Sequence, residues 1–117
     1  EENGFIAKRL KEAHRQGLAW RDMALISHYN KDLDARGSVL EKLGIPTISF
    51  RDADYSRSPD RVTLITMHSC KGLEFPLVVI PGTERIGSSN ELDPQETKLL
   101  YVAMTRATRE LVLCGVT

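Results

Sequence analysis

Three chemically versatile side chains stand close together in the stretch ITMHSCKGLEF, residues 65–75. His68, Lys71 and Glu74 follow the apolar, β-branched run VTLIT, which is typical of a buried strand. If the second half of the stretch formed a short helical turn, Lys71 and Glu74 would lie on one face of it, because residues three apart are neighbours on a helix. Gly72 would let a ligand approach backbone amides that are free to meet an anion. Taken singly, the same residues also fit a solvated Lys and Glu pair beside a loop histidine.

The second candidate region is the stretch ETKLLYVAMTRATREL, residues 96–111. Helical periodicity places Arg106 seven positions after Leu99, on the face that carries the apolar residues. A guanidinium at the end of a buried stripe needs a carboxylate, a phosphate or a helix C-terminus as its partner. Arg106 therefore either stabilises the last turn of its own helix or points across a domain boundary at a phosphate. Tyr101 and Thr105 are expected at a half-buried edge of this helix, with a contact surface as the alternative. The stripe consists of Leu99, Val102, Ala103 and Ala107.

Helical and strand-like segments alternate along the chain. This alternation is typical of right-handed parallel crossovers, so we predict an α/β fold with three layers and a mainly parallel sheet of about five strands. In such sheets ligands bind at the carboxyl ends of the strands, and we expect the stretch at 65–75 at this edge. The expected elements are a helix that ends near Gly17, a helix from Asn30 as N-cap to Gly44, a helix from Asp93 as N-cap to about Ala107, and strands at 22–27, 47–50, 62–66, 76–82 and 110–115.

Length and composition are those of one ordinary globular domain. The chain has 117 residues, of which 41% are hydrophobic and 27% are charged. Its 16 basic residues balance its 16 acidic residues, so it lacks the broad basic surface of a protein that holds nucleic acid by charge alone. No apolar run approaches the ~18 residues that cross a bilayer, and the start does not resemble a signal peptide. We therefore expect a cytoplasmic protein with no membrane partner. Two cysteines are too few for a disulfide framework.

Several motifs of self-sufficient ATPases are absent from the sequence. No G-x-x-x-x-G-K-[ST] loop occurs, so the chain has no phosphate-cradling loop of that type. No pair of acidic residues at strand ends indicates a magnesium site. A metal site made of His68, Cys70 and Glu74 would lack the spacing of known ligand sets. The chain is therefore not expected to hydrolyse ATP by itself.

Two motifs resemble those of superfamily 1 DNA helicases of the UvrD/Rep/PcrA type. VTLITMHSCKGLEFPLVVI resembles motif V of that family, T-x-H-x-x-K-G-L-E-F, and LLYVAMTRATREL resembles motif VI, with its Y-V-x-x-T-R-A core. The segment DMALISHYNKDLDARGSVLEKLGIP is similar to the segment that precedes motif V. The resemblance covers nearly the whole chain, with both motifs in the order and at the distance of the family.

The resemblance implies an architecture. Such proteins have two RecA-like domains of the P-loop NTPase type with ATP in the cleft between them, and residues 1–117 would be the second domain, without its own Walker A loop. The chain would then be a fragment of a longer helicase, partnered by the first RecA-like domain. A large insertion called 2B, where present, lies between the LGIP strand and motif V. Here only the polar loop at 51–61 occupies that place.

The resemblance also assigns roles to residues. Arg106 would be the catalytic arginine that reaches the γ-phosphate of ATP. Gly72 and Glu74 would lie at the nucleotide, and Mg would be held mainly by the first domain. Thr66 and His68 would face the track of single-stranded DNA. The resemblance leaves Lys71 unassigned.

The implied function is that of an ATP-dependent DNA helicase or translocase of the 3′-to-5′ type. This chain would supply half of the ATP site and part of the DNA track. The alternative from another class is a non-catalytic, degenerate motor half that acts as a protein-interaction or regulatory module. The intact charged positions of both motifs argue against that alternative.

Overall fold

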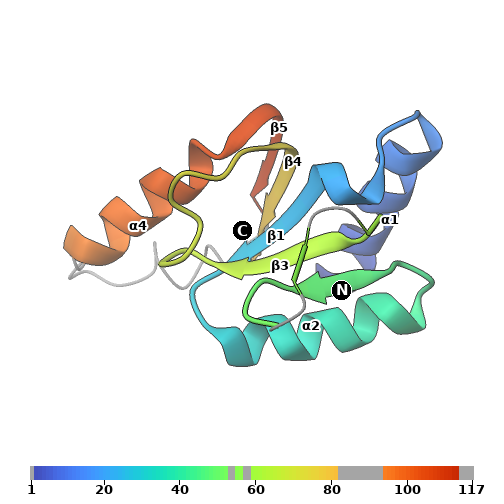
Figure 1. Cartoon of the computed structure of the whole chain (residues 1–117), viewed down its shortest axis with the longest axis horizontal. Coiled ribbons are helices and arrows are strands. Elements are labelled where there is room, and N and C mark those ends of the chain that lie inside the picture. Colours follow the sequence, from blue (N-terminus) through green and yellow to red (C-terminus); the bar gives the residue numbers. More distant parts are fainter. Residues whose placement is uncertain (1, 53–54, 57–58, 82–93, 114–117) are drawn as a thin grey trace.

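The computed structural model of the protein describes residues 2–52, 55–56, 59–81 and 94–113, except for the side chains of 94–97. Its centre is a sheet of five strands, all paired in parallel, in the order β2-β3-β1-β4-β5 (Figure 1). In chain order the elements are α1 (Glu2–Arg15), η1 (Trp20–Asp22), β1 (Met23–Ser27), α2 (Asn30–Lys42), β2 (Thr47–Ser49), β3 (Val62–Thr66), β4 (Phe75–Ile80), α4 (Pro94–Met104) and β5 (Ala107–Leu113).

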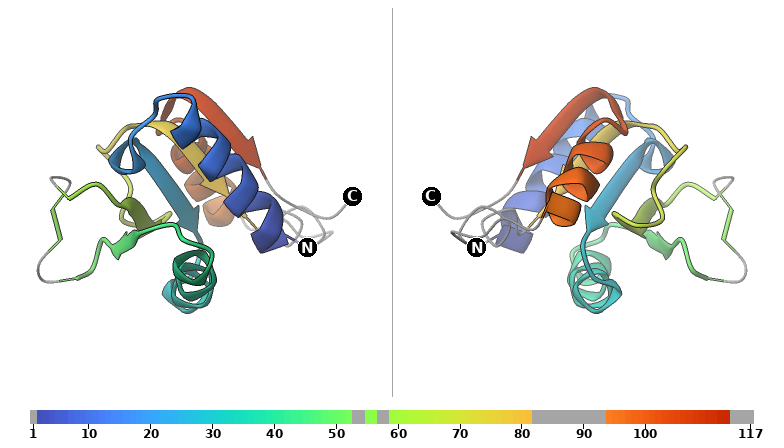
Figure 2. Two further views of the ribbon diagram at one scale, coloured as in Figure 1. Left: turned by 90° about the vertical axis from the view of Figure 1, so that its right-hand side faces the viewer. Right: turned by 90° about the vertical axis from the view of Figure 1, so that its left-hand side faces the viewer.

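Helices cover both faces of the sheet, which confirms the predicted three-layer α/β architecture. Figure 2 shows α1 and α4 on opposite sides of the strands. Successive residues of a strand point to opposite faces. Leu25 of β1 accordingly packs in the core with Leu10 of α1 and Leu40 of α2, and Ile26 packs in the core that includes Ala103 of α4. All five residues of β1 are buried, as expected for a strand that is covered on both faces.

The first two helices end as predicted, but the start of α2 differs by one residue. α1 ends shortly before Gly17, and α2 ends at Lys42, shortly before Gly44. Asn30 is the first residue of α2 instead of its N-cap, and Tyr29 holds the cap position. The reason is that Tyr29 has an extended backbone and its carbonyl already accepts the first helical hydrogen bond. No side-chain hydrogen bond caps this end of α2.

The helix that precedes Arg106 ends earlier than predicted. α4 ends at Met104, Thr105 and Arg106 form a turn, and β5 begins at Ala107, three residues before the predicted strand. The carbonyl of Arg106 accepts a hydrogen bond of 2.8 Å from the amide of Phe75, so the chain has already joined the sheet beside β4. Sheet pairing therefore competes successfully with the helical periodicity of this segment.

The connection from β3 to β4 contains no helix. Because the two strands are parallel, the chain must return to the opposite edge of the sheet, and residues 67–74 do so along the face that carries α4 (Figure 1). Cys70 is fully buried in the core on this face. Two turns shape the loop, with hydrogen bonds of 3.1 Å from Ser69 N to Thr66 O and from Leu73 N to Cys70 O. The structure describes every residue of this loop. The helical turn that the sequence suggested for it is absent.

The other long connections are described only in part. In the loop at 51–61, Tyr55 packs its ring against Phe50 at 4.9 Å and its hydroxyl lies 3.0 Å from Thr63 Oγ1. These contacts attach Tyr55 to β3 and to the residue that follows β2. The predicted N-cap Asp93, like the connector before it, lies outside the described residues. Within the described part of the chain, no helix has both the length and the apolar character needed to cross a bilayer.

Candidate functional site

The two candidate stretches meet at the amino edge of the sheet. Glu74 lies directly before β4 and Arg106 directly before β5, and the first residues of these strands, Phe75 and Ala107, are paired. The whole stretch at 65–75 was predicted at the carboxyl edge, which is wrong for its second half. The loop between β3 and β4 crosses the sheet from one edge to the other, so only its first residues stay at the carboxyl edge.

Arg106 is half-buried, and three acceptors hold its guanidinium. Its Nε donates to Val102 O at 3.1 Å in the last turn of α4, and its Nη2 donates to Thr105 Oγ1 at 3.0 Å. Its Nη1 reaches the loop between β3 and β4 and donates to Leu73 O at 3.4 Å. The Thr105 hydroxyl donates in turn to Val102 O at 2.7 Å, which closes a ring of hydrogen bonds. The guanidinium therefore stabilises the C-terminus of α4, one of the two alternatives left open by the sequence.

Two N–H groups of the Arg106 guanidinium have no hydrogen-bond acceptor among the described residues. A guanidinium carries five N–H donors, and three of them have the acceptors named above. No carboxylate among the described side chains forms an ion pair with Arg106. Burial raises the pKa of the nearby Cys70 thiol, and the positive charge of Arg106 opposes part of this shift. A fixed cation with spare donors at a sheet edge can bind an anion.

Glu74, Gly72 and Lys71 belong to the loop that Arg106 contacts, and all three are exposed. Gly72 has a φ of 86°, and a Cβ added to it would meet nothing within 4 Å. The turn closed by Leu73 N and Cys70 O therefore requires the positive φ of glycine, and open space surrounds this position. The surface at Gly72 is accessible to a ligand.

The carboxyl edge carries the other two predicted site residues. Thr66 ends β3 and is buried, with its hydroxyl donating to Ser69 Oγ at 3.3 Å. His68 is exposed in the turn that follows, and its ring lies 5.4 Å from the ring of His28, which follows β1. The structure thus separates the predicted site residues into two groups, Arg106 with Gly72 and Glu74 at one edge and Thr66 with His68 at the other.

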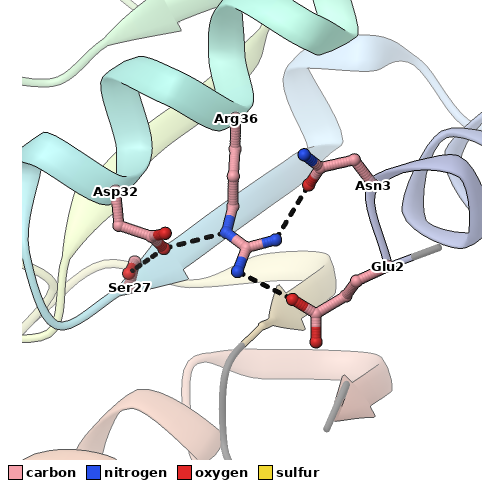
Figure 3. Close-up of polar contacts among 5 residues, drawn as sticks. All are labelled: Glu2, Asn3, Ser27, Asp32 and Arg36. Atoms are coloured by element: carbon pink, nitrogen blue, oxygen red, sulfur yellow. Dashed lines mark hydrogen bonds and ion pairs between the residues drawn. The ribbon is translucent and has the colours of Figure 1, made fainter. Parts of the chain in front are cut away.

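A cluster around Arg36 was missed by the sequence analysis. Arg36 is only 12% exposed and binds three partners, Asp32 Oδ2 at 2.8 Å, Asn3 Oδ1 at 2.8 Å and Glu2 Oε1 at 2.7 Å (Figure 3). Ser27 Oγ at the end of β1 donates to the same Asp32 oxygen at 2.7 Å. Burial disfavours the charge of Arg36, but the hydrogen bonds and charges of Asp32 and Glu2 outweigh it and hold the pKa of Arg36 above its ordinary value. The spacing of four between Asp32 and Arg36 was the only signal in the sequence.

Metal-ligating side chains do not gather in the part of the chain that the structure describes. Among these residues, no three His, Cys, Asp or Glu side chains come together in a group that could hold a metal ion.

Comparisons with known proteins agree on one family. Residues 48–116 match the family described as the UvrD-like helicase C-terminal domain. A probable DNA helicase of Mycoplasma pneumoniae is 34% identical over 122 residues, which cover 96% of this chain and 21% of that protein. The ATP-dependent DNA helicase PcrA of Staphylococcus aureus (strain Mu50) is 41% identical over 75 residues, which cover 56% of this chain and 10% of that protein. The ATP-dependent DNA helicase UvrD1 of Mycobacterium leprae is 37% identical over 90 residues, which cover 70% of this chain and 11% of that protein.

A solved structure shares the fold. The C-terminal domain of a possible DNA helicase from Lactobacillus plantarum WCFS1 superposes with a TM-score of 0.78 and 21% sequence identity, over 98% of this chain and 66% of that chain. The chain spans about a fifth or less of the length of the three named relatives. The family match, in contrast, extends over more than half of the chain and contains both candidate stretches. The chain therefore belongs to the UvrD-like helicase C-terminal domain family and is homologous to the PcrA and UvrD helicases.

Proposed function

We propose that this chain is the second motor domain of an ATP-dependent DNA helicase or translocase. In this proposal Arg106 contacts the γ-phosphate of ATP that another domain of the same protein holds. The observation that carries the proposal is the position of the Arg106 guanidinium, which three hydrogen bonds fix at the amino edge where the two motifs meet. Family membership supports the nucleotide as the ligand.

A fixed guanidinium suits phosphoryl transfer. The γ-phosphate gains negative charge on its oxygens during transfer, and a cation that is already oriented stabilises this charge without reorganising at that moment. Arg106 is oriented by Val102, Thr105 and Leu73, and it retains donors for a phosphate. This arrangement fits an arginine that completes a site built mainly elsewhere, and it agrees with the absence of a phosphate-cradling loop from the sequence.

The neighbours of Arg106 extend the proposed nucleotide surface. Glu74 is exposed and directly precedes β4, and the exposed turn at Gly72 leaves room for a ligand to approach the backbone. We assign both to the nucleotide side. Mg²⁺ would neutralise charge on the phosphates, and its ligands would come mainly from the first motor domain.

The carboxyl edge is the proposed DNA side. His68 is exposed there and is free to contact the strand, while Thr66 is buried. Thr66 therefore acts in this proposal by supporting the turn through its hydrogen bond with Ser69. The loop at 67–74 joins the two sides within one short segment, and its Leu73 carbonyl accepts a hydrogen bond from the Arg106 guanidinium. In this proposal a shift at His68 would reach Arg106 along this loop.

The test is steady-state ATP hydrolysis by the full-length protein that contains this chain, with and without single-stranded DNA. Wild type is expected to hydrolyse ATP faster when DNA is present. Arg106→Ala should reduce the DNA-stimulated kcat by about 10³-fold, as removal of a phosphate-clamping arginine does in related reactions. Arg15→Ala is the matched control, because Arg15 is an exposed arginine at the end of α1 that belongs to neither motif.

The possible outcomes separate the two candidate functions. If Arg106→Ala loses activity and Arg15→Ala does not, the motor function holds. If wild type hydrolyses no ATP in either condition, the motor function is wrong and the interaction module takes its place. If Arg106→Ala retains wild-type turnover, the chain does not supply the arginine of the ATP site.

A further inference from the structure

We propose that Tyr29 stacks on a base of single-stranded DNA, as an exposed ring of an aromatic corner formed by His28, Tyr29 and His68. This inference rests on the proposed function, because the strand is the ligand of that motor. It adds a base contact from Tyr29, the N-cap of α2, to a DNA side that the motifs limit to Thr66 and His68.

The three rings of the aromatic corner come from two separate segments. The rings of His28 and Tyr29 lie 4.4 Å apart in an edge-to-face arrangement with an interplanar angle of 81°. The rings of His28 and His68 lie 5.4 Å apart. Tyr29 is 57% exposed, and His68 is exposed as well. A lone exposed ring has no special meaning, but an exposed ring held by its neighbours beside a proposed DNA contact can serve as a platform on which a base stacks.

Hydrogen bonds fix the backbone next to the aromatic corner. The carbonyl of Ser27, directly before it, accepts a hydrogen bond of 2.9 Å from Met67 N and so ties the end of β1 to the loop that carries His68. The Ser27 hydroxyl donates to Asp32, and Arg36 fixes Asp32 and reaches over to α1 (Figure 3). A ring on a fixed backbone loses little conformational entropy when it binds, which favours Tyr29 as a stacking platform.

The charges near the aromatic corner also allow a phosphate backbone to pass. Both acidic residues of the first half of α2 have cationic partners, Asp32 with Arg36 and Asp34 with Arg51. Lys31, two positions after Tyr29, is exposed. A bound DNA strand would therefore meet the positive side chain of Lys31 next to the ring. The nearby carboxylates would repel it little, because cationic partners already compensate their charge.

The test compares two ligands of equal length, an oligothymidylate and an abasic strand with the same number of phosphates. Affinities for the full-length protein are measured by fluorescence anisotropy. We expect Tyr29→Ala to lower the ratio of the affinity for the oligothymidylate to that for the abasic strand by about 5- to 100-fold, the usual range for one stacked base. Tyr29→Phe should keep the ratio, because the ring remains.

Phe5→Ala is the control for loss of an exposed ring. Phe5 is 51% exposed on α1 and belongs to neither motif, so its removal should leave both affinities unchanged. Thermal unfolding of each variant verifies that Tyr29→Ala is folded.

The outcomes distinguish this inference from the function on which it rests. An unchanged ratio in Tyr29→Ala would overturn the stacking contact, while the motor function would stand if the wild type binds the strand and hydrolyses ATP. An equal loss for both strands would also overturn it, since Tyr29 would then act through the backbone or the fold. Failure of the wild type to bind any single strand would overturn both.

Discussion

Thr105 has a role at the residue scale that the motif pattern does not reveal. Its hydroxyl accepts a hydrogen bond from Arg106 Nη2 and donates one to Val102 O, so it sets the orientation of the guanidinium. Thr105 is exposed, and its substitution should therefore affect stability little. We regard Thr105 as a positioning residue for Arg106.

Replacement of Thr105 by valine, which has nearly the same shape, tests this role. Thr105→Val should lower the kcat for ATP hydrolysis of the full-length protein by about fivefold, because one orienting hydrogen bond is worth roughly 1 kcal/mol. The KM for ATP should change less, and Thr105→Ser should restore kcat. Equal activities of the valine and serine variants would show that the hydroxyl does not orient Arg106.

The backbone conformation at position 72 requires a glycine. With φ at 86° an L side chain is strained, although there is room for it. Gly72→Ala should therefore reduce the free energy of unfolding by about 1–2 kcal/mol. Gly4 in α1 is the matched control, since its φ is not positive and its surroundings are also open. Gly4→Ala should stabilise the protein by about 0.5 kcal/mol. Urea denaturation measures both changes, and equal effects of the two variants would contradict the account of Gly72.

At the scale of elements, Gly37 lets α2 lie close to β3. A Cβ at this position would stand 2.6 Å from Leu64 Cδ1, and Leu64 is buried, so its side chain has no solvent to move into. Alanine improves helix propensity by about 1 kcal/mol, but overpacking of a core costs about 1–3 kcal/mol. Gly37→Ala is therefore expected to be destabilising by about 1 kcal/mol in urea denaturation.

A double-mutant cycle identifies the contact responsible. Leu64→Ala removes the atom that a Cβ at position 37 would meet, at a cost of about 2–5 kcal/mol for the lost core contacts. In that background Gly37→Ala should become stabilising, with a coupling energy of about 1–3 kcal/mol between the two positions. Additive effects would mean that α2 and β3 are not in close contact through this pair.

The elements were predictable to the extent that their signals are local. Runs such as VTLIT and the glycines after α1 and α2 correctly indicated the strands and helix ends. The end of α4 was predicted too late, because the hydrogen bond between Arg106 O and Phe75 N depends on a partner 31 positions away. The acceptors of Arg106 are partly main-chain carbonyls, which every residue has, so no pattern of side chains predicts Leu73 as a partner.

The path of the loop at 67–74 is the main feature of the site that the sequence did not predict. His68 and Glu74 were predicted at one edge because only the strand that precedes the stretch was considered. Glu74 directly precedes the next parallel strand, and the start of that strand lies at the opposite edge. The structure places β1 between β3 and β4, so the chain crosses β1 and reaches the other edge within this loop. The residue roles implied by the family resemblance stay predictions, and the separation of Arg106 from His68 is compatible with them.

At the scale of the whole molecule, the balance of charge limits what this chain does alone. With 16 basic and 16 acidic residues, it is expected to neutralise few phosphates if it contacts single-stranded DNA as proposed. We expect the isolated chain to bind single-stranded DNA weakly, with a slope of log K against log salt of magnitude no more than about 2. It should hydrolyse no measurable ATP. Turnover by the isolated chain that survives Arg106→Ala would contradict this, as would a steep salt dependence.

The strand order also has a consequence for how the protein folds. Ala24 in the central strand pairs with Thr63 and Val78, which lie 39 and 54 positions later in the chain. No two strands of the described sheet form a hairpin, because every pair in it is parallel. Closing such long loops before any pairing is gained makes folding slow compared with proteins built from local contacts. During synthesis, β1 acquires both of its neighbours only after residue 80 has left the ribosome. The core under α1 and α2 therefore cannot be completed before β4, which begins at the last residue of the motif V pattern, has been synthesised.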